Sequence, residues 1–140
     1  MLKTKIYNHF MLQGNKSTSE KVFLKSFKIL QKNMNKDHKN LFKLAITNVA
    51  PIIQMKQIKK KKRKTVKEFP FVLNQKNRIT ISIKSIIKTA NRKANSKVYK
   101  KFFAELLAIA QNKSEILKIK ETNHEQALTK KKYIFFRWFC

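Results

Sequence analysis

Side chains that could perform acid–base or metal chemistry are few in this chain and lie far apart. The three histidines, His9, His38 and His124, fall in no spacing that zinc ligands use. Glu121 and Glu125 flank His124, an arrangement that could serve acid–base catalysis. On a basic helix, however, local Glu–Lys pairing explains these glutamates better. We therefore expect the histidines to be surface residues and predict no metal site.

The lone cysteine and the lone glycine also give catalysis little support. Cys140 has no base near it in the sequence that could activate its thiol, and one cysteine cannot build a disulfide framework. A glycine-rich phosphate-binding loop needs several glycines, whereas this chain has one. The sequence therefore predicts a protein that is not an enzyme and that uses no cofactor.

Positive charge is the chemistry that this sequence carries in quantity. Its 140 residues include 34 Lys and Arg against seven Asp and Glu, which gives a net charge of +27. Such a charge repels itself in a monomer and lowers its stability. We therefore expect a polyanion, in the simplest case nucleic acid, to neutralise it with a salt-dependent affinity. Because the basic residues are spread along the whole chain, embedding in RNA is favoured over one docking patch, and the histidines are then surface or RNA-facing.

The composition predicts a helical protein that contains a single domain over residues 1–140. Apolar residues make up 42%, while two prolines and one glycine are too few for a turn-rich β architecture. No apolar run reaches 18 residues, so we expect no membrane span, and the first residues resemble no secretory signal or organellar presequence. Lys outnumbers Arg 30 to 4, a bias typical of A/T-rich codons. Together these features favour synthesis inside an organelle, with a mitochondrion preferred and a plastid or a reduced bacterium as the alternatives.

The first half of the chain shows helical spacing of apolar residues. We expect a short helix within residues 2–12. Ser17 and Glu20 have the spacing of a capping box for a second helix. Asp37 is the expected N-cap of a third helix, which Pro51 ends because the residue before a proline disfavours the α region.

Residues 52–73 follow a different pattern. Two apolar flanks surround the basic block of residues 59–64, which predicts a β-hairpin with a charged, solvent-projecting tip. Pro70 would place its strand at an edge. A disordered basic loop is the alternative, because no glycine is present at the turn. The block also resembles a nuclear localisation signal by composition alone, but in a chain with 30 lysines such runs carry little information.

Helical stripes return from Asn77 onward. The first covers residues 79–94, although its beginning also fits a strand, and the second covers residues 98–110 after an expected N-cap at Ser96. A last basic helix starts near Glu115. The closing aromatic cluster at residues 133–139 is expected to dock on the core, with base stacking as the alternative. The predicted fold is mainly α: a bundle of five to six helices with one extended β-hairpin inserted after the third helix.

Several short motifs occur in a fixed order along nearly the whole chain. They are residues 14–20 (GNKSTSE), 48–51 (NVAP), Pro70, 91–97 (NRKANSK), 103–107 (FAELL), 111–113 (QNK), 118–124 (KIKETNH) and 136–138 (FRW). As an ordered set they resemble the universal small-subunit ribosomal protein seven family in its bacterial and organellar form. The chain departs from the family in nearly lacking its longer basic N-terminal arm, in having lysines where the hairpin has a glycine pair, and in stopping after Arg-Trp as short organellar versions do.

The resemblance implies a structural role in the small ribosomal subunit. It implies primary binding to the 3′ major domain of small-subunit rRNA, which organises the head together with neighbouring head proteins. It also implies that the hairpin lies near the exit-site tRNA and mRNA path and near the platform ribosomal protein eleven.

Lysines and the four scarce arginines form the predicted RNA-binding set. We expect the arginines to sit where a planar, bidentate fork is needed, and the helical stripe opposite Arg78 and Arg92 predicts that both point outward. The predicted residues are Lys16, Lys56, Lys59, Lys60, Lys61, Lys62, Arg63, Lys64, Lys76, Arg78, Arg92, Lys93, Lys97, Lys113, Lys118, Lys120, Lys130, Lys131, Arg137 and Trp138.

Two other functions share the charge. A histone-like DNA-architectural protein would bend DNA with an apolar wedge in the minor groove. A basic membrane-surface protein would need one helix with a cationic face opposite a deep apolar face. Here the apolar stripes belong to several helices that can pack on one another, so we predict no membrane partner.

Overall fold

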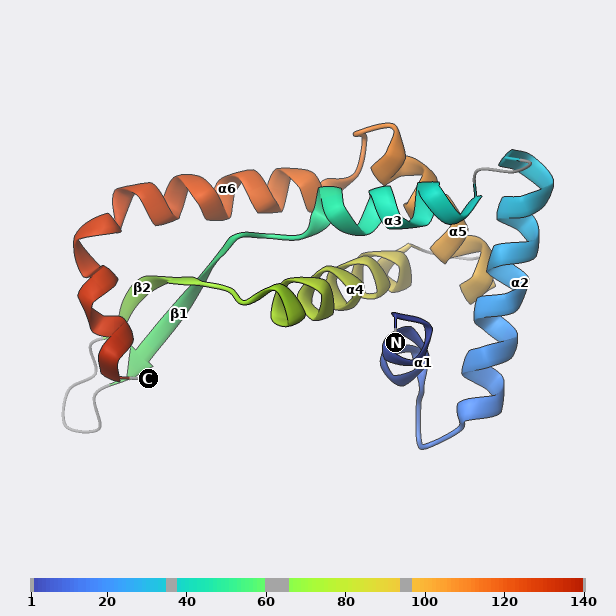
Figure 1. Cartoon of the computed structure of the whole chain (residues 1–140), viewed down its shortest axis with the longest axis horizontal. Helices are drawn as coiled ribbons and strands as arrows, with labels where there is room; N and C mark the ends of the chain where they lie inside the picture. The colour runs from blue at the N-terminus through green and yellow to red at the C-terminus, as the bar shows by residue number, and fades with distance from the viewer. Residues whose placement is uncertain (1, 35–37, 60–65, 94–96, 140) are drawn as a thin grey trace.

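The computed structural model describes residues 2–34, 38–59, 66–93 and 97–139 (Figure 1). Within them, helices and one hairpin follow one another in the order predicted, so the mainly α fold with a hairpin after the third helix is confirmed. The elements are α1 (Leu2–Phe10), α2 (Lys16–Met34), α3 (His38–Val49), β1 (Ile53–Lys59), β2 (Val66–Val72), α4 (Gln75–Arg92), α5 (Val98–Ala110), α6 (Glu115–Thr129) and the 3₁₀ helix η2 (Lys131–Phe139).

The start of α2 differs from the predicted capping box. Because α2 already begins at Lys16, Ser17 lies within its first turn and not before it. The Ser17 hydroxyl donates to Asn15 Oδ1 (3.2 Å), and the Thr18 hydroxyl donates to the Asn15 carbonyl oxygen (2.8 Å). The predicted capping box is therefore wrong. The expected N-caps Asp37 and Ser96 lie outside the described residues.

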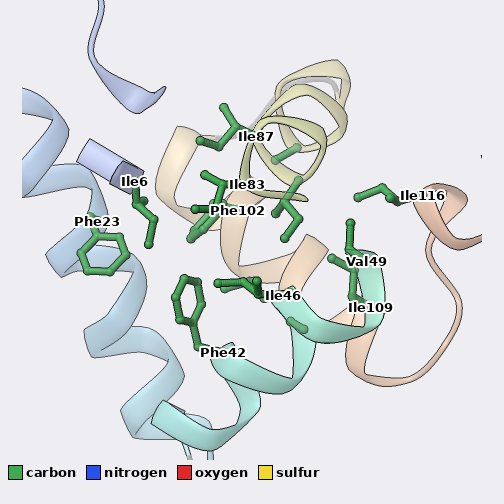
Figure 2. Packing of buried hydrophobic residues seen from close by; sticks show 14 of the residues in the cluster. Ile6, Phe23, Phe42, Ile46, Val49, Ile83, Ile87, Phe102, Ile109 and Ile116 are labelled. Carbon is green, nitrogen blue, oxygen red and sulfur yellow. The ribbon is translucent and has the colours of Figure 1, made fainter. Parts of the chain in front are cut away.

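The apolar stripes of the helices meet in one buried cluster, which Figure 2 shows from close by. The α4 stripe contributes Ile83, Ile86, Ile87 and Ala90, as predicted from its spacing. Helix α5 packs against α2, α3 and α4 and therefore lies at the centre of the helical part. The buried cluster consists of Ile6, Phe23, Leu30, Phe42, Ala45, Ile46, Val49, Ile83, Ile86, Ile87, Ala90, Phe102, Leu106, Ile109 and Ile116.

The hairpin leaves the helical part at one end of the molecule (Figure 1). Its strands pair antiparallel from Ile53 opposite Val72 to Lys59 opposite Val66. The strands overturn the alternative of a disordered loop for residues 53–59 and 66–72, and residues 60–65 lie outside the described part. Helix α6 packs along β1, and η2 packs on β2 and on the end of α6. The closing aromatic segment therefore docks chiefly on the hairpin, whereas we expected it to dock on the helical core.

Among the described residues, no helix combines the length and the apolar character that crossing a membrane requires.

Candidate nucleic-acid interface

Part of the predicted RNA-binding set is exposed and available to a partner. These side chains are distributed over α2, α4, α6, η2 and the turns on both sides of α5. The exposed members are Lys16, Lys76, Arg92, Lys93, Lys97, Lys113, Lys118 and Lys131.

Another part of the set contacts the protein itself. The structure contradicts the prediction that Arg78 points outward, because this side chain is partly buried and its Nε donates to the Pro51 carbonyl oxygen (3.1 Å). Lys120 Nζ donates to the Asn48 carbonyl oxygen (2.7 Å) near the end of α3. Both cations bind backbone carbonyls near the base of the hairpin, and they help to fix its direction relative to α3, α4 and α6.

Lys93 takes part in a buried polar network that joins three helices. Its Nζ lies 2.7 Å from Glu105 Oε2, and the two side chains are 44% and 3% exposed. The other carboxylate oxygen of Glu105 accepts a hydrogen bond from the Ser114 hydroxyl, which in turn accepts from the Ile116 amide as the N-cap of α6. A buried carboxylate requires such partners. Lys93 thus neutralises an internal charge at the same surface where we predicted contact with RNA.

The hairpin also uses predicted RNA-binding lysines for its own packing. Lys130, just after α6, forms an ion pair with Glu68 on β2, whose carboxylate also accepts from Gln57 Nε2 (2.8 Å). The hydrogen bonds from Lys130 and Gln57 lower the pKa of Glu68 from its usual value. Lys56 Nζ lies 3.9 Å from the centroid of the Phe71 ring on the paired strand, a cation–π contact.

Five predicted residues are brought together where α4 ends and α6 begins. Arg92, Lys93 and Lys113 line a cavity of about 360 Å³. Lys118 and Lys120 line a second cavity of about 700 Å³. Ser114 lines both cavities, so the two are neighbours. We call the five basic residues around them the basic strip.

The remaining predicted residues have no described side-chain contacts. Lys60, Lys61, Lys62, Arg63 and Lys64 lie outside the described residues. For Lys59 at the end of β1, and for Arg137 and Trp138 in η2, only the backbone is described.

Two of the histidines are less exposed than the sequence suggested. His9 is partly buried, and burial, together with the neighbouring Lys84 and Lys5, lowers its pKa from the usual value. His124 lines the larger cavity of the basic strip, and its Nε2 is buried without a hydrogen-bond partner among the described residues. In that same part of the chain, no three His, Cys, Asp or Glu side chains gather in a way that could hold a metal ion.

A further basic surface was missed by the sequence analysis. A cavity of about 680 Å³ is lined on the α2 side by Lys25, Lys28, Ile29, Gln31 and Lys32. Tyr99 of α5 lines its other side. The lysine spacing was visible in the sequence as the exposed face of α2. The Tyr99 ring, however, belongs to a helix more than 60 positions later in the chain, so only the fold brings it next to the lysines of α2.

Comparison with known proteins decides the family. The family model described as ribosomal protein S7p/S5e matches residues 1–131. The chain belongs to this family. Small ribosomal subunit protein uS7 of Wigglesworthia glossinidia brevipalpis and that of Moorella thermoacetica are each 27% identical over 135 residues, covering 96% of this chain and 85% of the relative. The uS7 protein of Thermotoga neapolitana is 25% identical over 138 residues, covering 99% and 88%.

Membership in the S7p/S5e family confirms the resemblance and assigns the general role. The chain is a structural component of the small ribosomal subunit and not an enzyme. It acts within the ribosome, in contact with small-subunit rRNA and other ribosomal proteins. The family thereby accounts for the net charge of +27, which no fold requires by itself.

Proposed function

We propose that this chain binds the 3′ major domain of small-subunit rRNA as one domain over residues 1–140 and organises the head of the subunit. The basic strip carries the proposal. Its exposed cations Arg92, Lys113 and Lys118 lie beside two cavities, next to Lys93 and Lys120, which are held by contacts within the protein. The buried cluster that joins the helices holds this surface rigid, which preorganises it for RNA.

Charge supplies most of the affinity in this proposal. Each lysine that neutralises a phosphate releases counterions, so affinity falls steeply as salt rises. Arg92 differs from the lysines because its planar guanidinium can bind a phosphate or a base edge with two parallel hydrogen bonds. Its side chain is exposed at the end of α4, where it can make such contacts.

We further propose that the basic block at residues 59–64 approaches the exit-site tRNA and mRNA path. The paired strands support this role, because they carry Lys59 and Val66 to the far end of a hairpin that leaves the helical part. Neutralising the block should impair steps of the decoding cycle more than head assembly, and added salt should reduce the effect. Loss of small subunits, with normal function in those that assemble, would instead identify the block as an rRNA anchor.

A protein partner on the hairpin side of the molecule also belongs to the proposal, because η2 packs on both β2 and α6. Val72, Leu128 and Phe135 are 62%, 73% and 77% exposed and belong to β2, α6 and η2. Exposed apolar side chains on neighbouring elements are typical of a protein contact. We propose the platform ribosomal protein eleven as that partner, and Leu128→Ser with Phe135→Ser should weaken its binding to the assembled subunit.

We propose a mitochondrial ribosome as the location, with a plastid as the alternative. The composition supports it, because residues with A/T-rich codons are abundant and Lys replaces most Arg. Locating the gene in an organellar genome would test this proposal directly.

The experiment compares the affinity of the full chain for three ligands at matched salt. These are the cognate 3′ major domain of small-subunit rRNA, a duplex DNA of equal length and anionic liposomes. The proposal predicts the tightest binding to the rRNA. Equal or tighter binding to the DNA, together with DNA bending, would favour the histone-like alternative, and preferential binding to liposomes would favour a membrane-surface protein.

A further inference from the structure

Helices α2 and α5 form a basic groove at the end of the molecule opposite the hairpin (Figure 1). Lys25, Lys28 and Lys32 recur every three to four residues along one face of α2, so their side chains line the same side of the helix. Tyr99 enters from the first turn of α5 and completes the groove. The cavity of about 680 Å³ falls within the range of about 300–1,000 Å³ that is usual for ligand sites.

A buried side chain joins the two helices, α2 and α5, that form the groove. Ser26 of α2 is fully buried, and its single hydroxyl hydrogen is shared between the Val22 carbonyl oxygen of its own helix (2.9 Å) and the Tyr99 carbonyl oxygen across the helix interface (3.2 Å). The contact with the Tyr99 carbonyl oxygen and the packing of α2 on α5 hold the backbone that carries the Tyr99 ring beside α2, which favours a groove formed before any ligand binds.

The groove combines an aromatic ring with cations, which is the combination that binds unpaired nucleotides. Lys25 Nζ lies over the Tyr99 ring, 6.0 Å from its centroid. Tyr99 is only partly buried, and the apolar side chain of Ile29 lines the cavity beside it. Proteins bind single-stranded RNA by stacking bases on aromatic rings while lysines follow the phosphates.

Charge and surface chemistry select the ligand. None of the six described residues that line the groove is acidic, so it is complementary to a polyanion. A peptide of acidic residues alone would pair with the lysines but would leave the aromatic ring beside Ile29 without a matching group. A nucleotide offers both a phosphate and a flat apolar face.

We propose that the α2–α5 groove binds a single-stranded segment of RNA: one unpaired base stacks on Tyr99 in place of Lys25, whose ammonium then joins Lys28 and Lys32 on the adjoining phosphates. The proposal rests on the proposed function, in which RNA is the polyanion. It adds a second RNA-binding surface, separate from the basic strip and from the hairpin.

The experiment maps contacts of the full chain by ultraviolet crosslinking and mass spectrometry. The probes are an unstructured oligoribonucleotide and the cognate 3′ major domain of small-subunit rRNA. Wild-type protein is compared with Tyr99→Leu, which removes the ring, Tyr99→Phe, which keeps it, and Lys28→Gln with Lys32→Gln. Lys39→Gln with Lys43→Gln is the matched charge control, because both lysines are exposed on α3 outside the groove.

The proposal predicts a crosslink to the peptide that contains Tyr99, lost in Tyr99→Leu and kept in Tyr99→Phe. Affinity for the oligoribonucleotide should fall about five- to a hundredfold in Tyr99→Leu. It should also fall more in the groove lysine variant than in its charge control. Circular dichroism checks that each variant remains folded. The crosslink in the wild-type protein tests the proposal even if a variant fails to fold.

Three results would overturn the proposal in distinguishable ways. If wild-type protein binds the cognate rRNA tightly but gives no crosslink at Tyr99, the groove is not an RNA site although the proposed function stands. If wild-type protein does not bind that rRNA, the proposed function fails and the groove proposal fails with it. Displacement of the crosslink by a short polyglutamate at lower concentration than by RNA would assign the groove to an acidic protein instead.

Discussion

Ser114→Ala tests how the basic strip is held in place. The Ser114 hydroxyl has two structural roles: it caps the N-terminus of α6 by accepting from the Ile116 amide (3.3 Å), and it donates to the buried Glu105 carboxylate. Glu105 in turn pairs with Lys93 at the end of α4. Removing one hydroxyl therefore disturbs α4, α5 and α6 together.

The size of the effect follows from these two roles. Loss of an N-cap costs about 1 kcal/mol, and loss of a hydrogen bond to a charged group costs about 1.5–3 kcal/mol. Because Lys93 continues to neutralise Glu105, we expect a value at the lower end of the sum, a decrease of about 2.5–3 kcal/mol in the free energy of unfolding.

Urea denaturation at high ionic strength measures this change, because salt screens the self-repulsion of the free protein. Ser17→Ala is the matched control. Ser17 is exposed in the first turn of α2 and donates only to Asn15 Oδ1, so its loss should cost less than about 0.5 kcal/mol. If Ser114→Ala is as stable as the control, the network does not hold the helices together and the reasoning is wrong.

Three further predictions concern RNA and the hairpin. Cognate rRNA at about a hundred times its Kd should stabilise the chain by about 2.7 kcal/mol, and an unchanged thermal midpoint would contradict this. Arg92→Lys should weaken rRNA binding by about 1 kcal/mol or more if the bidentate fork is used, whereas wild-type affinity would indicate a bulk charge contact. Because Lys130 and Gln57 lower the pKa of Glu68, the hairpin contact with α6 is present above the ordinary pKa of a glutamate and is lost as pH falls through the lowered value. The protection factors of β2 amides, which correct for the intrinsic pH dependence of exchange, should therefore fall modestly at acid pH in the wild type and should already be lower in Lys130→Met at neutral pH; equal protection in both proteins would refute the contact.

Much of the fold could be predicted from the sequence because its signals are local. The apolar spacing in α4 predicted a buried face, and Ile83, Ile86 and Ile87 lie in the core. Pro51 marked the end of α3, since a proline restricts the residue before it. The start of α2 was mispredicted because Asn15 and Ser17 are both good N-cap residues, and the sequence alone did not decide between them.

The roles of individual cations could not be predicted in the same way. Arg78 and Lys120 have backbone carbonyl partners from distant parts of the chain, and Lys93 has a buried carboxylate partner. Because lysines occur along the whole chain, the sequence alone does not distinguish these structural cations from those free to bind RNA. Tyr99 was missed for the same reason, because its neighbours Lys25 and Lys28 come from another helix.

The most direct test of the central claim is a cryo-electron microscopy map of small ribosomal subunits from cells depleted of this protein. The account predicts an ordered body and a head in which the 3′ major domain of the rRNA is disordered, with order restored when the wild-type chain is supplied. A fully ordered head in subunits that lack the chain would contradict the account.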